Sequence, residues 1–163
     1  MRTFVYITTL LLVSCILSSC QKEFLNPDDS PLDTTVFFKA KINGVQFIAV
    51  LTGAAIRPDS VISIAGESND KQMIVFAVKD SGVHVYTLAI NSVFNFGGYT
   101  DANSTAFSSN EGINPGDSGG NLAIVSIDRV RRVISGTFNF KAFHQDNRTQ
   151  RIITEGVFKN ISY

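Results

Sequence analysis

The sequence has no tryptophan, only two histidines and two cysteines, and no excess of charge of either sign. Fourteen lysines and arginines balance fourteen acidic residues without a basic cluster, so a nucleic-acid partner is not expected. Both cysteines lie within the first 20 residues, which leaves the rest of the chain without a disulfide. A chain of 163 residues forms one domain at most, and here the burial of apolar side chains must stabilise it.

An apolar segment runs from Phe4 to Leu17 after the positive charge of Arg2, interrupted only by two threonines and a serine. A short positive region before such a segment is typical of a secretory signal. Spanning a bilayer as a helix takes about 20 apolar residues, more than this segment provides. We therefore expect residues 1–19 to be an export signal that is removed from the mature protein.

The export segment ends in Leu17-Ser18-Ser19-Cys20, which resembles the bacterial lipobox, an apolar residue and two small residues before the cysteine that receives diacylglycerol. The resemblance implies cleavage before Cys20 and lipidation of its thiol. Leu12-Val13-Ser14-Cys15 fits the same pattern, but cleavage there would leave Ile16 and Leu17 on the mature chain. Several acyl chains hold a protein at a membrane without a transmembrane segment. An ordinary cleaved signal with an incidental cysteine is the alternative.

Residues 20–35 contain two prolines, three aspartates and few large apolar side chains, and such a segment cannot bury enough surface to order itself. We expect it to be a tether between the lipid and the domain. Gln21-Lys22-Glu23 resembles the signal that sends Bacteroidetes-type lipoproteins to the outer face of the outer membrane, although Phe24 stands where that signal has a second acid. The resemblance implies an outer-membrane lipoprotein, with the cell surface favoured over the periplasmic face.

Apolar and polar residues alternate from Val36 onward with the period of two that is typical of half-buried strands. Asn43-Gly44 is the pair that best suits a type I′ turn, so residues 36–51 are predicted to form a hairpin. The pattern predicts a single all-β domain over residues 36–163, an antiparallel β-sandwich or partly open barrel of about nine strands. Further strands are predicted over Val61–Gly66, Gln72–Lys79, Val83–Ile90, Ser92–Tyr99, Asn121–Asp128, Val133–Phe143 and Ile152–Ile161.

The segment Phe38-Lys39-Ala40-Lys41-Ile42-Asn43-Gly44-Val45-Gln46-Phe47 opens the predicted domain, and Ile134-Ser135-Gly136-Thr137-Phe138-Asn139-Phe140 and Ile153-Thr154-Glu155-Gly156-Val157-Phe158 close it. These segments are similar to those of a family of Bacteroidetes-type lipoproteins of unknown function. The resemblance implies a fold and a location in the cell envelope, and the family has no assigned activity. We interpret the motifs as structural, because Phe138 and Phe140 share one face of a strand. Gly136 interrupts that face, as at a bulge or at a close approach of another chain.

The string Gly116-Asp117-Ser118-Gly119-Gly120 resembles the nucleophile motif of chymotrypsin-like serine proteases, in which the glycines free backbone amides for an oxyanion hole. That chemistry also needs a histidine base and an aspartate that orients it. His84 is the only upstream histidine and lacks the small-residue motif of that family, and Asp101 qualifies by position alone. We therefore interpret the string as a turn after Asn114-Pro115 and expect no catalytic residues.

The metal-binding patterns are also incomplete. Asp101 opens a run of alternate oxygen-bearing side chains, but Ala106 and Gly112 stand where an EF-hand loop requires glycine and glutamate. A looser calcium site formed by Asp101, Asn114 and Asp117 remains as an alternative. Apart from that alternative, no metal and no cofactor are expected.

Four aromatic residues lie close together in the sequence, Phe94, Phe96, Tyr99 and Phe107. If they are exposed, they line a ligand groove; if they are buried, they form the core face of a strand. Burial is favoured, because phenylalanine prefers the protein interior.

The remaining polar features have simple interpretations. His84 and His144 are far apart in the sequence and no cysteine remains for zinc. Three arginines within residues 129–132 are expected to form a solvated hairpin tip. Ser60, in Asp59-Ser60-Val61, resembles an acceptor for bacterial O-glycosylation, which implies a surface position.

These features together predict a lipid-anchored protein of the cell envelope whose domain is a non-catalytic binding or structural module. The expected partners are the membrane, through Cys20, and an envelope protein or a glycan. One alternative is a hydrolase-type enzyme centred on the 101–120 loop. The other is a carrier of a small ligand, for which an apolar cavity must open inside the barrel.

Overall fold

The computed structural model of the chain describes residues 33–79, 82–90, 92–112, 117–144 and 149–163. Residues 34–163 form one compact unit. The predicted export signal, Cys15, Cys20 and most of the predicted tether lie outside the described residues. Among the described residues, no helix is long and apolar enough to cross a membrane.

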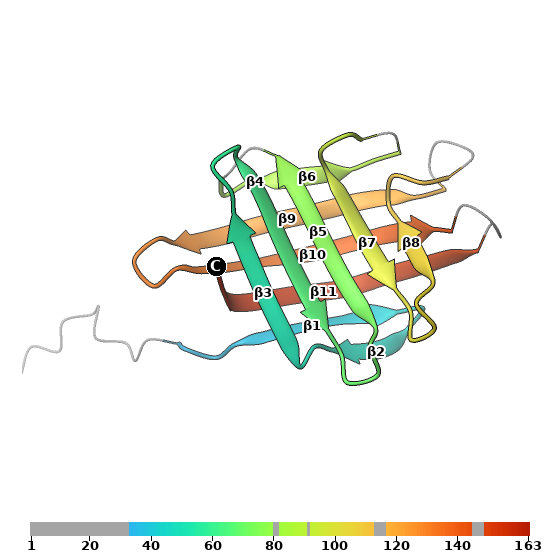
Figure 1. The fold of residues 1–163 in the computed structure, drawn as a ribbon, viewed down its shortest axis with the longest axis horizontal. Coiled ribbons are helices and arrows are strands. Elements are labelled where there is room, and N and C mark those ends of the chain that lie inside the picture. The colour runs from blue at the N-terminus through green and yellow to red at the C-terminus, as the bar shows by residue number, and fades with distance from the viewer. Residues whose placement is uncertain (1–32, 80–81, 91, 113–116, 145–148) are drawn as a thin grey trace, which may run out of the picture. The chain divides into compact units, whose positions relative to one another are not determined.

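The described part of the domain is all-β, as the sequence predicts, with eleven antiparallel strands in one continuous curled sheet (Figure 1). This partly open barrel corresponds to the second of the two predicted architectures. The strands are β1 (Phe37–Ile42), β2 (Val45–Ile48), β3 (Leu51–Ile56), β4 (Val61–Glu67), β5 (Met73–Lys79), β6 (Val85–Leu88), β7 (Phe96–Thr100), β8 (Ala106–Ser108), β9 (Gly119–Asp128), β10 (Val133–Phe143) and β11 (Gln150–Ser162).

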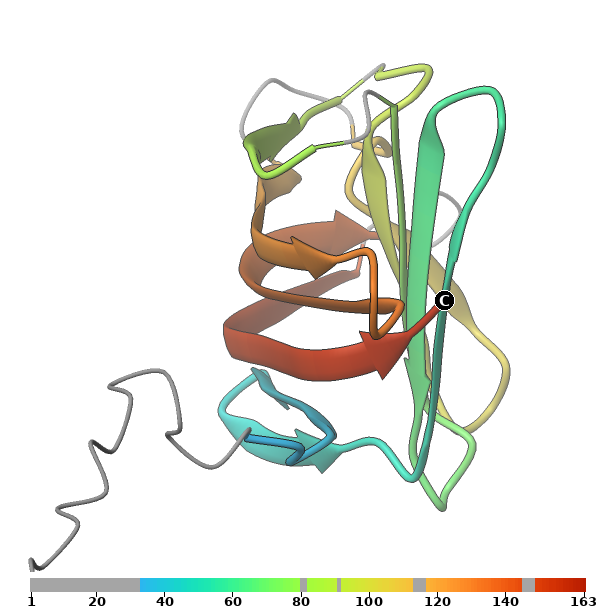
Figure 2. The same ribbon diagram turned by 90° about the vertical axis from the view of Figure 1, so that its left-hand side faces the viewer.

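The curled sheet has two layers whose strands cross steeply. In the back sheet the strands follow the order β6–β9–β10–β11–β1–β2, and in the front sheet the order β3–β4–β5–β7–β8. β10 pairs with β8 through Phe143 and Ser108, which joins the two sheets at one corner. Figure 1 views the front sheet from outside, and Figure 2 shows the back sheet on the left and the front sheet on the right. Crossed layers of this kind enclose one core between them.

The strands β2 and β3 are the two ends of the main strand path, from which β9 and β6 branch, yet they follow each other in the sequence. Only Ala49 and Val50 connect them. The amide of Ala49 donates to the carbonyl oxygen of Phe38 in β1 (2.9 Å), and the amide of Val50 donates to that of Glu67 in β4 (2.8 Å). The chain therefore passes from the back sheet to the front sheet in two residues, and this crossing joins the sheets a second time.

Phenylalanines from both sheets meet in the core. The ring centroid of Phe138 in β10 lies 5.2 Å from that of Phe38 in β1 and 4.8 Å from that of Phe76 in β5, and Phe140 lies 5.4 Å from Phe76. All four rings are buried, which confirms that Phe138 and Phe140 are core residues. Burying each ring contributes about 1.5–3 kcal/mol to stability.

Two local predictions are confirmed. Asn43 and Gly44 both have positive φ angles, 50° and 83°, as a type I′ turn requires. Gly136 lies at a register shift of β10 against both neighbouring strands. A Cβ atom added at Gly136 would stand 2.2 Å from the carbonyl oxygen of Ala123, so no side chain fits there.

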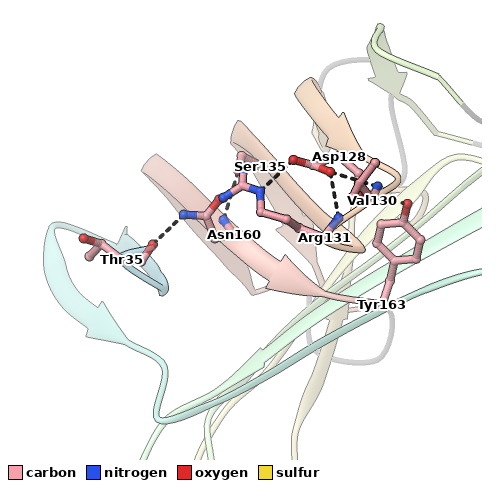
Figure 3. Close-up of polar contacts among 7 residues, drawn as sticks. All are labelled: Thr35, Asp128, Val130, Arg131, Ser135, Asn160 and Tyr163. Atoms are coloured by element: carbon pink, nitrogen blue, oxygen red, sulfur yellow. Dashed lines mark hydrogen bonds and ion pairs between the residues drawn. The ribbon is translucent and has the colours of Figure 1, made fainter. Parts of the chain in front are cut away.

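The start of the domain is fastened to the last strand (Figure 3). The side-chain Nδ2 of Asn160 in β11 donates to the carbonyl oxygen of Thr35 (3.0 Å). The backbone amide of the same residue donates to Oγ of Ser135 in β10 (2.9 Å). Asn160 is buried and has a φ angle of 51°, a conformation that asparagine tolerates better than most residues. The bond to Thr35 holds the chain in place just before β1 begins, and the bond to Ser135 joins β11 to β10.

Several strand boundaries differ from the prediction. The sequence pattern does not predict β3, which is rich in small residues (Thr52-Gly53-Ala54-Ala55), or β8, which is three residues long with Phe107 as its one large apolar side chain. β6 and β7 begin later than the predicted segments over 83–90 and 92–99. β9 begins at Gly119, inside the predicted turn, because pairing with β10 extends further than the alternating pattern.

Candidate functional site

The serine of the protease-like string has a structural role. Ser118 is 8% exposed, and its hydroxyl donates to the carbonyl oxygens of Ser109 (2.9 Å) and Glu111. The two glycines that follow it belong to β9. A Cβ atom at Gly120 would stand 2.2 Å from the carbonyl oxygen of Asn139, so strand packing accounts for that glycine.

The structure does not bring the other two triad candidates to Ser118. β6 pairs with β9 so that Leu88 lies opposite Gly120, and continuing this register places Ser118 opposite position 90. His84 is six positions from there, roughly 20 Å along the strand. Asp101 lies in the turn between β7 and β8, where its Oδ1 accepts hydrogen bonds from the backbone amides of residues 103 and 105, both at 2.9 Å. Those bonds, first that of the residue 105 amide, lower the pKa of Asp101.

The possible calcium ligands are only partly described. Asn114 lies outside the described residues, and the backbone carbonyl of Asp117 accepts a hydrogen bond from Nε2 of Gln150. Among the residues that the structure describes, no group of three histidine, cysteine, aspartate or glutamate side chains could hold a metal ion. The ring of His84 packs against Tyr86 (5.3 Å between centroids). His144 packs against the ring of a phenylalanine in β8 (5.5 Å).

The four aromatic residues considered for a groove have different environments. Tyr99 and Phe107 are buried, as the favoured interpretation predicts, and their rings lie 5.8 Å apart. Phe107 belongs to β8 and not to a loop. Phe96 is half-buried, whereas Phe94 is 53% exposed, with Nζ of Lys79 4.3 Å from its ring centroid. The prediction of burial is therefore wrong for Phe94, which lies before the first residue of β7.

The arginine-rich turn and Ser60 are both at the surface. Residues 129–132 connect β9 to β10, and the carboxylate of Asp128 accepts hydrogen bonds from the amides of Val130 (2.9 Å) and Arg131 (2.8 Å) and from the guanidinium of Arg131 (2.6 Å) (Figure 3). The amide of Arg131 is the main cause of a lowered pKa of Asp128. Ser60 lies exposed in the turn between β3 and β4, with a φ angle of 65°.

An open groove lies where the β1–β2 hairpin faces the turn between β4 and β5. It consists of two adjoining hollows of about 410 and 430 Å³, which share Gln46 and Gln72 in their linings. We call this pair of hollows the hairpin groove. Its lining residues are Ile42, Asn43, Val45, Gln46, Phe47, Ile48, Val50, Ser68, Asn69, Asp70, Gln72, Tyr99 and Arg151.

A chain of hydrogen bonds fixes the polar side of the hairpin groove. The Tyr99 hydroxyl donates to Oε1 of Gln72 (2.5 Å), Nε2 of Gln72 donates to Oδ2 of Asp70 (2.5 Å), and the Ser68 hydroxyl donates to Oδ1 of Asp70 (2.5 Å). The bond from Ser68, followed by that from Gln72, lowers the pKa of Asp70. Because a carboxylate only accepts, the amide of Gln72 has one orientation, with one N–H and one lone pair left over.

Tyr99 and Arg151 form the adjoining wall of the groove. Burial, followed by the charge of Asp101, raises the pKa of the Tyr99 hydroxyl, so it stays protonated and keeps donating to Gln72. The guanidinium of Arg151 lies 4.5 Å from the ring centroid of Phe107 and 4.0 Å from the carboxylate of Asp101. A guanidinium carries five N–H donors, so this position keeps donors for a further group.

The free edge of β2 borders the same groove. β2 pairs only with β1 among the described strands. In a hairpin with a two-residue turn, Ile42 and Val45 exchange both backbone hydrogen bonds, so the peptide groups of Gln46 and Ile48 point away from β1. The Ile48 side chain is 60% exposed. The edge therefore offers backbone donors and acceptors beside an apolar side chain.

Sequence reasoning missed the hairpin groove because its polar residues come from four segments that are distant in the sequence and carry no motif. In the sequence Tyr99 belongs to an aromatic cluster, and nothing there links it to Gln72 or Arg151. Their proximity arises from pairing between strands, β5 with β7 and β1 with β11. The groove thus brings amide, carboxylate, phenol and guanidinium groups together beside the exposed apolar side chain of Ile48.

The model of a protein family, described as a domain of unknown function (DUF6252), matches residues 34–162, which is nearly the whole of the described domain. No curated protein and no solved structure matches the chain. The matched segment agrees with the resemblance to a family of unknown function that the hairpin and the two closing strands indicated. The chain therefore belongs to the DUF6252 family of domains of unknown function.

Proposed function

We propose that this protein is a lipoprotein, anchored at the outer membrane through Cys20, whose β domain binds a glycan in the hairpin groove without catalysis. The observation that carries the binding role is the hydrogen-bonded chain from Tyr99 through Gln72 to Asp70. It orders polar groups before any ligand arrives, and groups that are already ordered bind at a lower entropic cost.

The chemistry of the groove supports a glycan as the ligand. Sugar hydroxyls both donate and accept hydrogen bonds, so they suit a site that mixes acceptors and donors. Asp70 supplies an acceptor, Arg151 supplies donors, and the amides of Gln46 and Gln72 supply both. The exposed side chain of Ile48 gives the apolar faces of sugar rings a surface to cover.

A binding role is favoured over hydrolysis by the state of Ser118. Its hydroxyl proton is engaged with backbone carbonyl oxygens, whereas a nucleophilic serine presents that proton to a histidine base. The register of β6 and β9 also separates Ser118 from His84. The most tempting catalytic string is thus explained by packing.

The ligand proposal is tested with an array of neutral and acidic oligosaccharides and the purified domain, followed by calorimetry on any glycan that is retained. We expect Gln72→Ala to weaken binding about tenfold or more, because it removes hydrogen bonds worth about 1.5 kcal/mol or more. Asn121→Ala, a change of an exposed side chain on the back sheet, is the matched control and should bind normally. Absence of binding across the array, or equal loss with the control, refutes the glycan proposal.

The anchor is tested separately by labelling growing cells that express the full chain with radioactive palmitate. Incorporation should be abolished by Cys20→Ser and retained by Cys15→Ser. A mature N-terminus that mass spectrometry places elsewhere than Cys20, or label that persists in Cys20→Ser, overturns the anchor without affecting the groove.

A further inference from the structure

The central strand of the front sheet is apolar on both faces. In β5 the side chains of Ile74, Phe76 and Val78 point into the core and are fully buried. The alternate residues Met73 and Val75 are also apolar, although they lie on the outer side. An antiparallel sheet with one wet face has polar residues at such positions. The outer side of the front sheet therefore has the composition of a covered surface.

Strand pairing extends this apolar surface across the whole front sheet. One row across it contains Gly53, Ala65, Val75, Gly98 and Ser108, and the next contains Ala55, Ser63, Ala77 and Phe96. These rows contain no charged residue, and apart from Val75 and Phe96 their side chains are small. We call this surface the front outer face. Figure 1 views it directly, and none of the described elements lies over it.

Charges occur at the two ends of the front outer face. Glu67 ends β4 and lies opposite Met73, whereas Lys79 ends β5 and lies opposite Val61. The two charged residues are six positions apart along the strands, roughly 20 Å. Nζ of Lys71 lies 3.1 Å from Glu67, but that lysine is 75% exposed, so the pair is weak. The outward side chains of β4 and β5 thus carry a carboxylate at one end, small or apolar groups in the centre and an ammonium at the other end.

We propose that a second copy of this chain covers the front outer face. The two copies pack face to face about a two-fold axis that lies in the interface and runs across the strands. This axis places the Glu67 end of one copy over the Lys79 end of the other, at both ends of the interface. An axis parallel to the strands would instead place like charges together. The face is therefore complementary in charge to a second copy of itself, in this orientation.

The available area fits a weak dimer. The five strands of the front sheet have six, seven, seven, five and three residues. At about 3.3 Å per residue and about 4.8 Å between strands, they span roughly 440 Å². Two such faces remove about 890 Å² from water, which lies in the range of weak, reversible interfaces. Small side chains allow the sheets to approach closely, and the separation of about 10 Å is the usual distance between packed sheets.

The first test is the mass in solution of residues 34–163, which contain the whole described core and must first show cooperative unfolding. At about 50 µM, well above the dissociation constant of a micromolar dimer, light scattering should give twice the mass of the chain. Val75→Lys should raise the dissociation constant at least about 100-fold, because it buries an unpaired charge in each copy. Asn139→Lys, on the outer side of the back sheet, is the matched control and should remain a dimer.

The second test addresses the orientation. Lys79→Glu and Glu67→Lys should each weaken the dimer, because each puts like charges together at both ends of the interface. The double variant Glu67→Lys/Lys79→Glu should restore it. A dimer that neither single change weakens, or that the double change does not restore, overturns the proposed axis. A wild-type domain that stays monomeric at this concentration, or a Val75→Lys variant that stays dimeric, overturns the proposal as a whole. Neither result affects glycan binding in the hairpin groove.

Discussion

The strands β5 and β10 occupy central positions in the two sheets, and they differ in what their outer sides carry. Both bury phenylalanine inward, Phe76 from β5 and Phe138 from β10. Outward, β10 presents Thr137, Asn139 and Lys141, which are exposed, whereas β5 presents apolar residues that are only partly exposed. One strand is built for water on its outer side and the other is not.

This difference shows that the outward residues of a strand, and not the inward ones, indicate what surrounds each sheet. The inward residues of both strands are explained by the one core that the sheets share, so they do not distinguish the sheets. The outward residues do not pack in that core, and their polarity reports the surroundings of the folded domain. The back sheet therefore faces solvent, and the composition of the front sheet calls for a second layer.

The comparison is sharpened most by substitutions within β10. Phe138→Ala should lower the free energy of unfolding by about 3–5 kcal/mol, because the ring touches phenylalanines of both sheets and leaves a cavity. Thr137→Ala, on the opposite face of the same strand, should change it by less than about 0.5 kcal/mol. Urea denaturation followed by circular dichroism measures both. Equal losses would mean that the outer side of the back sheet is not a solvent face.

A second prediction concerns the region where the two sheets meet. Ser118→Ala should lower the free energy of unfolding by about 1–3 kcal/mol, because the carbonyl oxygens of Ser109 and Glu111 lose their donor. Ser126→Ala, an exposed position in the same strand β9, is the control and should be nearly neutral. A Ser118→Ala domain as stable as the wild type would return that hydroxyl to consideration as a reactive group.

A smaller effect is expected at the start of the domain, which belongs to the back sheet alone. Asn160→Gly should cost about 0.5–1.5 kcal/mol, because it removes the hydrogen bond to Thr35 while glycine accepts the positive φ angle. Asn160→Ala should cost about 1 kcal/mol more, since alanine is strained in that conformation. Thermal unfolding of the two variants separates the side-chain bond from the backbone strain. An alanine variant as stable as the glycine variant would contradict the assigned conformation.

The smallest effect is a dependence on pH that the turns of both sheets share. The folded-state pKa of Asp128 in the back sheet, and of Asp70 and Asp101 in the front sheet, is lowered. A lowered pKa adds stability above the unfolded value of about 3.9, and that stability is lost as the pH falls through the folded-state pKa. Asp128→Asn should therefore reduce the difference in urea midpoint between pH 7 and pH 3. If the difference in urea midpoint between pH 7 and pH 3 stays the same in the variant, Asp128 does not contribute to the pH dependence of stability.

The sequence predicts those parts of the fold in which neighbouring residues allow only one backbone conformation. Asn43-Gly44 determines the first hairpin, and the strict alternation in β10 identifies it as a strand with one wet side. β3 and β8 escape prediction because their residues are small or few, and pairing with neighbouring strands, rather than their own composition, holds them. Ser118 misleads because glycines required by strand packing resemble glycines required by an oxyanion hole.

The hairpin groove is harder to predict for a different reason. Gln72 lies beside Tyr99 because β5 pairs with β7, and Arg151 lies beside Asn43 because β11 pairs with β1. Neither pairing follows from alternation, which specifies the face of a side chain and not its neighbour on the next strand. A site of this kind becomes visible only when the strand order is known.

The two-residue crossing at Ala49 and Val50 has a mechanical consequence. Because the two end strands of the main strand path are consecutive in the chain, the seam beside the hairpin groove is spanned by a covalent strap whose amides are both anchored, one to each layer. Separating the two layers at this point requires breaking one of these two backbone hydrogen bonds. The proposed ligand would therefore have to fit the hairpin groove at the width that these bonds hold.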